Sequence, residues 1–173
     1  MTYVLAYPEF EPAVGKRIDA FRSNHEPGRA GIVPPHITLV FGLRNPHLQE
    51  FFEVCEDAAA AVSEFAVDFK KTEIVYDSFE NTHKIFLVCS TGKSRLIELH
   101  DLLYNGPNRK ELNLDIPYRP HMTVATNVDR TVIENLDVTD IGALPISGTV
   151  RSLEVVDFTN GVLRPLRTFL FRS

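Results

Sequence analysis

Cysteines are scarce in this chain, and their spacing excludes several kinds of site. Only Cys55 and Cys89 occur among its 173 residues, with no CxxC pair and no other paired metal-ligand spacing. A thiolate metal site is therefore not indicated, and nothing in the sequence supports a disulfide. We interpret both cysteines as small buried residues of a protein in a reducing compartment.

Long apolar runs and an excess of basic residues are also missing. No apolar run approaches the roughly 18 residues that a transmembrane helix needs, and residues 1–10 lack the basic and apolar regions of a signal peptide. We therefore expect a cytoplasmic protein that does not associate with membranes. Lys and Arg number 18 against 23 Asp and Glu, a net charge of −5. This balance disfavours stable binding to a nucleic-acid duplex and favours a small nucleotide or an RNA end.

The residues that are present suffice for one domain. A content of 44% hydrophobic and 24% charged residues can build one core, or two small lobes that share one. One helix is expected to begin with Asn45 as N-cap and Pro46 at its first position. Apolar spacing and turn residues together predict strands over residues 3–7, 36–41, 65–75, 84–90, 118–126, 148–158 and 167–171, and helices over residues 14–21, 45–62, 94–103 and 129–136.

Two short segments of these strands are nearly identical. They are Pro35-His36-Ile37-Thr38-Leu39 and Pro120-His121-Met122-Thr123-Val124. Side chains alternate between the two faces of a strand, so each His shares a face with its Thr while the apolar neighbours point the other way. One such segment is typical of a structural histidine. Two copies predict a site in which two imidazoles and two hydroxyls hold an anionic group between them.

The order of the predicted elements also repeats. Leu5 precedes His36 by 31 positions, and Leu87 precedes His121 by 34. This pattern predicts a diverged duplication within one domain over residues 1–173, with units of roughly residues 1–80 and 81–173. We expect an α+β fold of two pseudo-symmetric lobes, each of mainly antiparallel sheet with flanking helices, and an active-site cleft between the lobes.

The chain resembles the two-histidine (2H) phosphoesterase superfamily, and within it the bacterial and archaeal branch named for 2′-5′ RNA ligase and RNA 2′,3′-cyclic phosphodiesterase activity. The resemblance spans nearly the whole chain and rests on the tetrads His36-Ile37-Thr38-Leu39 and His121-Met122-Thr123-Val124. It implies that the His and Thr of both tetrads are the catalytic residues of a metal-free hydrolase. The implied reaction converts the 2′,3′-cyclic phosphate of a nucleotide or RNA terminus to a 2′-phosphate.

Two histidines can supply both proton transfers of such a reaction. Opening a cyclic phosphodiester requires a water deprotonated on one side of phosphorus and a leaving oxygen protonated on the other. An imidazole with an ordinary pKa of about 6.5 can be base or acid near neutral pH, and threonine hydroxyls can donate to the non-bridging oxygens. We assign His121 as base and His36 as acid, although the symmetry of the motifs leaves the reverse order open. Neither tetrad contains a carboxylate to complete a metal-ligand set, so we expect no metal and no cofactor.

Further residues are candidates for substrate binding. Arg119 lies two residues before His121 on the same predicted face, where it can reach a phosphate or form a surface ion pair. An aromatic ring can stack a base, although core packing is the alternative for Phe41. The full set of binding candidates is Arg119, Tyr7, Phe41, Tyr118 and Arg44. The other histidines are expected to be structural or exposed: His25, His47, His83 and His100.

Other functions are compatible with the same motifs. One is a module that binds nucleotides or RNA ends in this cleft without turnover. Another is a 2H phosphodiesterase with a different substrate, such as ADP-ribose 1″,2″-cyclic phosphate, a 2′-5′ linkage or a non-nucleotide phosphodiester. Gly92-Lys93-Ser94 has the context of a nucleotide-binding P-loop, but Leu87 stands where that motif requires glycine. We expect a monomer, with base and sugar selection in the segments before each motif strand, residues 22–33 and 104–117.

Overall fold

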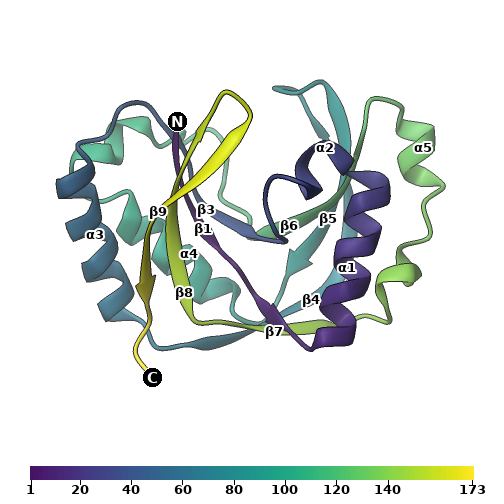
Figure 1. Ribbon diagram of the computed structural model, residues 1–173, viewed down its shortest axis with the longest axis horizontal. Helices are drawn as coiled ribbons and strands as arrows, with labels where there is room; N and C mark the ends of the chain where they lie inside the picture. The colour runs from purple at the N-terminus through teal and green to yellow at the C-terminus, as the bar shows by residue number, and fades with distance from the viewer.

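Two antiparallel sheets form the framework of the protein, which we describe from a computed structural model of residues 1–173 (Figure 1). The first sheet has the order β3-β1-β8-β9, with β1 (Thr2–Ala6), β3 (Ile37–Leu43), β8 (Ser152–Thr159) and β9 (Val162–Leu170). The second sheet has the order β2-β7-β4-β5-β6, with β2 (Glu9–Phe10), β4 (Phe65–Asp77), β5 (Thr82–Cys89), β6 (His121–Asn127) and β7 (Ile146–Val150).

Helices flank both sheets. α3 and α4 pack with the first sheet, and α1 and α5 pack with the second. This arrangement confirms the predicted α+β class with antiparallel sheets and flanking helices. The helices are α1 (Pro12–His25), α2 (Pro27–Ala30), α3 (Leu48–Ala61), α4 (Lys93–Leu103) and α5 (Arg130–Glu134), and the 3-10 helices are η1 (Gly106–Glu111) and η2 (Val138–Ile141).

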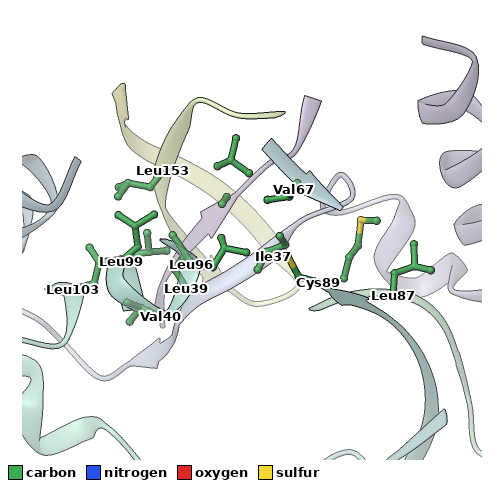
Figure 2. Close-up of a cluster of buried hydrophobic side chains, with 14 of the residues drawn as sticks. Ile37, Leu39, Val40, Val67, Leu87, Cys89, Leu96, Leu99, Leu103 and Leu153 are labelled. Carbon is green, nitrogen blue, oxygen red and sulfur yellow. The ribbon is translucent and has the colours of Figure 1, made fainter. Parts of the chain in front are cut away.

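One hydrophobic core of 33 buried residues joins the sheets and their helices. Leu96, Leu99 and Leu103 recur at helical spacing along α4 and face Ile37 and Leu39 of β3 within it (Figure 2). Each fully buried leucine contributes roughly 1.5–3 kcal/mol of transfer free energy. The apolar residues of the motif strands are therefore anchored, and this anchoring fixes where the polar residues of the same strands point.

The start of α3 differs from the sequence prediction. Asn45 is not an N-cap, because its φ of 53° lies in the left-handed region, which asparagine tolerates better than most residues. It turns the chain after β3, and α3 begins at Leu48 with His47 at the N-cap. The expectation for Asn45 and Pro46 was therefore wrong by about one half-turn of helix.

The strand predicted over residues 148–158 is two strands in different sheets. β7 ends at Val150 in the second sheet, and β8 begins at Ser152 in the first. Arg151 alone joins them, and its guanidinium forms ion pairs with Glu9 and Glu64. The chain passes between sheets without a turn, so the sequence shows no break at this point.

Neither sheet is built from one half of the chain. The first sheet combines residues 2–43 with residues 152–170, so the C-terminal strands complete the first lobe. The expected unit boundary near residue 80 falls inside the β4-β5 hairpin of the second sheet. The lobes therefore do not coincide with the two expected sequence units, and the duplication itself stays a prediction.

Two expectations about composition can be compared with the structure. Cys55 and Cys89 are both buried and free, as predicted, and burial raises the pKa of the Cys55 thiol to about 12 and that of Cys89 to about 11. None of the helices has the length and apolar character needed to cross a lipid bilayer.

Candidate active site

The two motif strands are edge strands that meet between the sheets. β3 is one edge of the first sheet and β6 is one edge of the second. The two strands contact each other near the centre of the molecule (Figure 1). Segments that are 85 positions apart in the sequence therefore come together, and the lobes meet at the two His-x-Thr tetrads.

Each motif strand carries a β-bulge immediately after its threonine. In β3, Thr38 pairs with Leu5 and Val40 pairs with Val4, so Leu39 has no partner on β1. In β6, Thr123 pairs with Phe86 and Ala125 with Ile85, so Val124 is the unpaired residue. Bulges of this kind bend a strand and re-aim its side chains. The same irregularity follows both threonines.

The bulges explain the burial pattern of the tetrads. The apolar residues on either side of each threonine are buried, and so is the residue after each bulge: Ile37, Leu39, Val40, Met122, Val124 and Ala125. The two histidines and two threonines stay partly accessible. The one side-chain bond to Thr38 reaches its backbone carbonyl, and neither threonine hydroxyl forms a hydrogen bond within the protein, so both are free to donate to a ligand.

Both imidazoles are held by the same type of hydrogen bond. Nδ1 of His36 lies 2.9 Å from the carbonyl oxygen of Pro34, and Nδ1 of His121 lies 2.6 Å from that of Arg119. A carbonyl oxygen only accepts, so Nδ1 carries the hydrogen in each neutral ring. Nε2 is therefore the nitrogen left for proton transfer in both residues.

Burial lowers the pKa of both histidines. Desolvation is the largest cause for His36, outweighs the bond to Pro34 and brings its pKa to about 4, with smaller contributions from Arg22, Arg29 and His121. For His121, burial again lowers the pKa most, and Arg119 and Lys84 lower it further. Both rings are therefore neutral at pH 7 in the free protein. The surrounding cations favour an anionic ligand.

Each imidazole packs against an aromatic ring. Phe86 of β5 stacks on His121 with ring centroids 3.7 Å apart, and Tyr7 meets His36 edge-on at 6.4 Å. Phe86 was absent from the sequence-based candidates. Its proximity follows from the register that pairs it with Thr123, and no motif in the sequence reveals that register. Tyr7 lies beside His36, where it was predicted to contact substrate.

Tyr118 holds the backbone of β3. Its hydroxyl donates to the carbonyl oxygen of Thr38 at 3.0 Å, and its ring stacks on His100 with centroids 3.9 Å apart. His100 in turn donates from Nδ1 to the carbonyl oxygen of Leu39 at 2.7 Å. One face of Tyr118 is therefore covered by a buried structural histidine. Its position favours alignment of the first tetrad, and contact with a base stays a prediction.

The remaining candidates divide into near and distant residues. Arg119 lies beside His121 but pairs with Glu73 at 2.7 Å, the ion pair considered as its alternative. Phe41 is 49% exposed, so core packing was the wrong alternative for it. Arg44 is eight residues beyond His36, about 26 Å along an extended strand at about 3.3 Å per residue. The structure therefore does not bring Arg44 to the histidines.

The resulting arrangement suits acid–base chemistry on an anion. Two Nε2 atoms and two free hydroxyls come from two facing strands, with basic residues around them. No group of three or more His, Cys, Asp or Glu side chains is arranged to hold a metal ion.

Similarity to known proteins covers most of the chain. A family model described as the 2′-5′ RNA ligase superfamily matches residues 10–161. No curated protein sequence matches the chain.

Solved structures share the fold over its whole length. TT0787 of Thermus thermophilus superposes with a TM-score of 0.68 at 19% identity, over 99% of this chain and 98% of that one. E. coli LigT in its apo form gives 0.61 at 17% identity, over 100% and 99%. Kluyveromyces marxianus Usb1 gives 0.55 at 11%, over 95% and 96%. E. coli LigT has also been crystallised with 3′-AMP, at 16% identity to this chain, with a TM-score of 0.61 over 99% and 98% of the two chains.

Proposed function

The chain belongs to the 2′-5′ RNA ligase superfamily of two-histidine phosphoesterases, and we propose that it hydrolyses 2′,3′-cyclic phosphates of nucleotides or RNA ends to 2′-phosphates. Members of the superfamily act on phosphodiester bonds. The finer proposal adds the cyclic substrate, the hydrolytic direction and a mechanism that needs no metal ion. The 3′-AMP complex of E. coli LigT supports a nucleotide ligand.

One observation carries the proposal. His36 and His121 both use Nδ1 to bond a backbone carbonyl and both keep Nε2 free, on strands that face each other. A site that only binds phosphate does not need two proton-transfer nitrogens on opposite sides of it. A hydrolase needs both nitrogens, because phosphoryl transfer requires a proton removed on one side of phosphorus and another delivered on the opposite side.

We assign the roles within the site as follows. His121 accepts the proton of the attacking water at Nε2, and His36 delivers a proton from Nε2 to the leaving ribose oxygen. The hydroxyls of Thr38 and Thr123 donate to the non-bridging oxygens, where negative charge is concentrated. Each proton transfer is worth about 10²- to 10⁴-fold in rate.

The acid must gain its proton together with the substrate. Burial keeps the pKa of His36 near 4 in the free protein, so this ring is neutral before binding. An anionic phosphate within hydrogen-bond distance stabilises the imidazolium and raises its pKa. Binding of the substrate therefore favours the protonated form of His36, which is the form that acts as the acid.

Hydrolysis of the four nucleoside 2′,3′-cyclic monophosphates in excess EDTA tests the proposal. We expect turnover that EDTA does not abolish, with the nucleoside 2′-phosphate as product, identified by chromatography against both isomers. Binding of the cyclic nucleotides without turnover would instead indicate a recognition module. Formation of the 3′-phosphate would contradict the proposed direction of opening.

A further inference from the structure

A pocket of about 370 Å³ opens beside His36 on the first sheet. This volume is at the small end of the range for small-molecule sites, which is about 300–1,000 Å³. Its walls are mainly apolar or aromatic, and Glu154 is its single charged group. The lining residues are Tyr7, Ile32, Pro34, Glu154, Leu163 and Pro165.

The pocket adjoins the candidate active site through two shared residues, Pro34 and Tyr7. Pro34 lines it and also accepts the hydrogen bond from Nδ1 of His36. Tyr7 lines it and contacts the ring of His36 edge-on. A ligand whose phosphate lies between the histidines can therefore extend directly into this pocket.

The strand register places Glu154 in line with Thr38. Leu5 of β1 pairs with Thr38 on one side and with Glu154 on the other. Residues paired across neighbouring strands point to the same face, so the hydroxyl and the carboxylate share a face two strands apart, about 10 Å at a spacing of about 4.8 Å. One nucleoside bridges such a distance from its phosphate to the edge of its base.

The Glu154 carboxylate has acceptor capacity to spare. Oε1 accepts a hydrogen bond from Thr168 at 3.2 Å, the Tyr7 hydroxyl also donates to the carboxylate, and no Lys or Arg forms an ion pair with the side chain. Burial, the Glu154 charge and the hydrogen bond to Glu154 raise the pKa of the neighbouring Tyr7, which therefore keeps its hydroxyl proton. An ionised carboxylate offers about four acceptor sites, so those left over after Thr168 and Tyr7 suit a ligand that brings hydrogen-bond donors.

Glu73 occupies the corresponding position in the second sheet, but it forms ion pairs with basic residues. Thr123 pairs with Phe86, and Phe86 pairs with Glu73 on its other side. Glu73 is neutralised by Lys71 and Arg119, each at 2.7 Å. Of the two glutamates that lie two strands from a motif threonine, only Glu154 is left for a ligand. We therefore expect the part of the substrate that carries hydrogen-bond donors to bind beside Glu154 on the first sheet.

We propose that this pocket is a nucleobase subsite selective for guanine, an inference that rests on the proposed function and adds base selection to it. A base lies between apolar and aromatic walls and presents its Watson–Crick edge to polar groups. Guanine alone presents two adjacent N–H donors on that edge, which match the two oxygens of Glu154. Uracil presents one N–H between two carbonyl oxygens, which the carboxylate repels.

The subsite also fixes the orientation of the substrate. With the base in the first sheet, the ribose lies on the side of His36, and the leaving ribose oxygen faces that ring. Water then approaches phosphorus from the side of His121, in line with the leaving oxygen. The pocket thus supports His36 as acid and His121 as base, an order that the sequence motifs left open.

Glu154→Gln tests the subsite, with Glu134→Gln as control. Glu134 is an exposed carboxylate paired with Arg130 on α5, away from the pocket. We expect the wild type to favour guanosine over uridine 2′,3′-cyclic phosphate at least 10-fold in kcat/KM. Glu154→Gln should lose about 10- to 100-fold in kcat/KM for guanosine, the usual range for a hydrogen bond to a charged group, and should lose nothing for uridine, because the repelling charge is gone. The control should match the wild type.

The possible outcomes separate the subsite from the proposed function. Equal rates for guanosine and uridine substrates, or equal losses for both in Glu154→Gln, would overturn the subsite and leave the proposed function standing. Retained uridine turnover in Glu154→Gln shows that the variant is folded.

If no cyclic nucleotide is hydrolysed, the proposed function fails, and calorimetric binding of guanosine and uridine 3′-monophosphates then tests the pocket. Tighter guanosine binding that Glu154→Gln removes supports the subsite, and equal binding overturns it.

Discussion

The ring of Phe86 lies flat against the ring of His121, with centroids 3.7 Å apart and planes inclined by 19°. No such cover exists at His36, where Tyr7 approaches edge-on at 6.4 Å and an inclination of 63°. The two histidines therefore share their backbone hydrogen bonds and their place after a proline, but they differ in what packs on the ring. This difference can be tested at each residue separately.

Phe86→Ala should raise the pKa of His121 toward its ordinary value of about 6.5. The phenyl ring excludes water from the imidazole, and burial is the largest cause of the lowered pKa. Titration of the His121 ring proton by NMR measures the shift. Phe79→Ala, at a residue 82% exposed on the β4-β5 turn, is the control. A His121 pKa that stays unchanged or falls in Phe86→Ala would refute this explanation.

The pH profile of kcat/KM should be bell-shaped with its maximum below pH 6.5. Activity requires one proton on the histidine pair, a state populated between the two pKa values of the free protein. The pKa of His36 is lowered to about 4 and that of His121 is also lowered, so this window lies between about 4 and 6.5. A maximum at pH 7.5 or above would contradict the lowered values.

Single histidine variants should each retain one limb of that profile. Without the acid, the residual rate depends only on a neutral base, so His36→Ala should show activity that rises with pH to a plateau. His121→Ala retains only the acid, and its residual activity should fall as pH rises. The measurement is kcat/KM from pH 4 to 9 for both variants. If activity instead falls with pH in His36→Ala and rises with pH in His121→Ala, then His36 is the base and His121 is the acid.

Much of the candidate site could be predicted because the His-x-Thr motif occurs twice in the sequence. Two His-x-Thr segments with apolar neighbours identify the catalytic candidates, and strand alternation gives the shared face. The bulges at Leu39 and Val124 could not be predicted, because an unpaired residue is visible only in the pairing with the adjacent strand. Phe86 and Glu154 were missed for the same reason, since each reaches the site through register.

The fold shows a similar limit. Apolar spacing predicted most helices and strands, but the partner of each strand depends on tertiary packing. β8 and β9 join the first sheet from the far end of the chain, and Arg151 changes sheets without a turn. The aromatic character of Tyr118 predicted stacking on a nucleobase, which stays a prediction, but did not reveal that its hydroxyl bonds the Thr38 carbonyl. Composition alone does not show which hydrogen bond a tyrosine makes.

Tyr118→Phe should lower kcat more than it changes KM. The lost hydroxyl frees the backbone of Thr38, which misaligns the first tetrad, and the free energy of unfolding should fall by about 1 kcal/mol. Urea denaturation and steady-state kinetics measure the two effects. Tyr76→Phe, which removes a hydroxyl bonded to Asn81 on an exposed hairpin, is the matched control. Equal kinetics in the two variants would show that Tyr118 does not position the site.

The central claim is that His36 and His121 act as one catalytic unit. Turnover of a nucleoside 2′,3′-cyclic phosphate in excess EDTA should therefore be compared in the wild type, His36→Ala, His121→Ala and the double variant, after circular dichroism has shown that all four are folded. We predict that each single change lowers kcat/KM about 10²-fold or more, and that kcat/KM of the double variant is close to that of the less active single variant. A double variant with wild-type turnover would contradict the account.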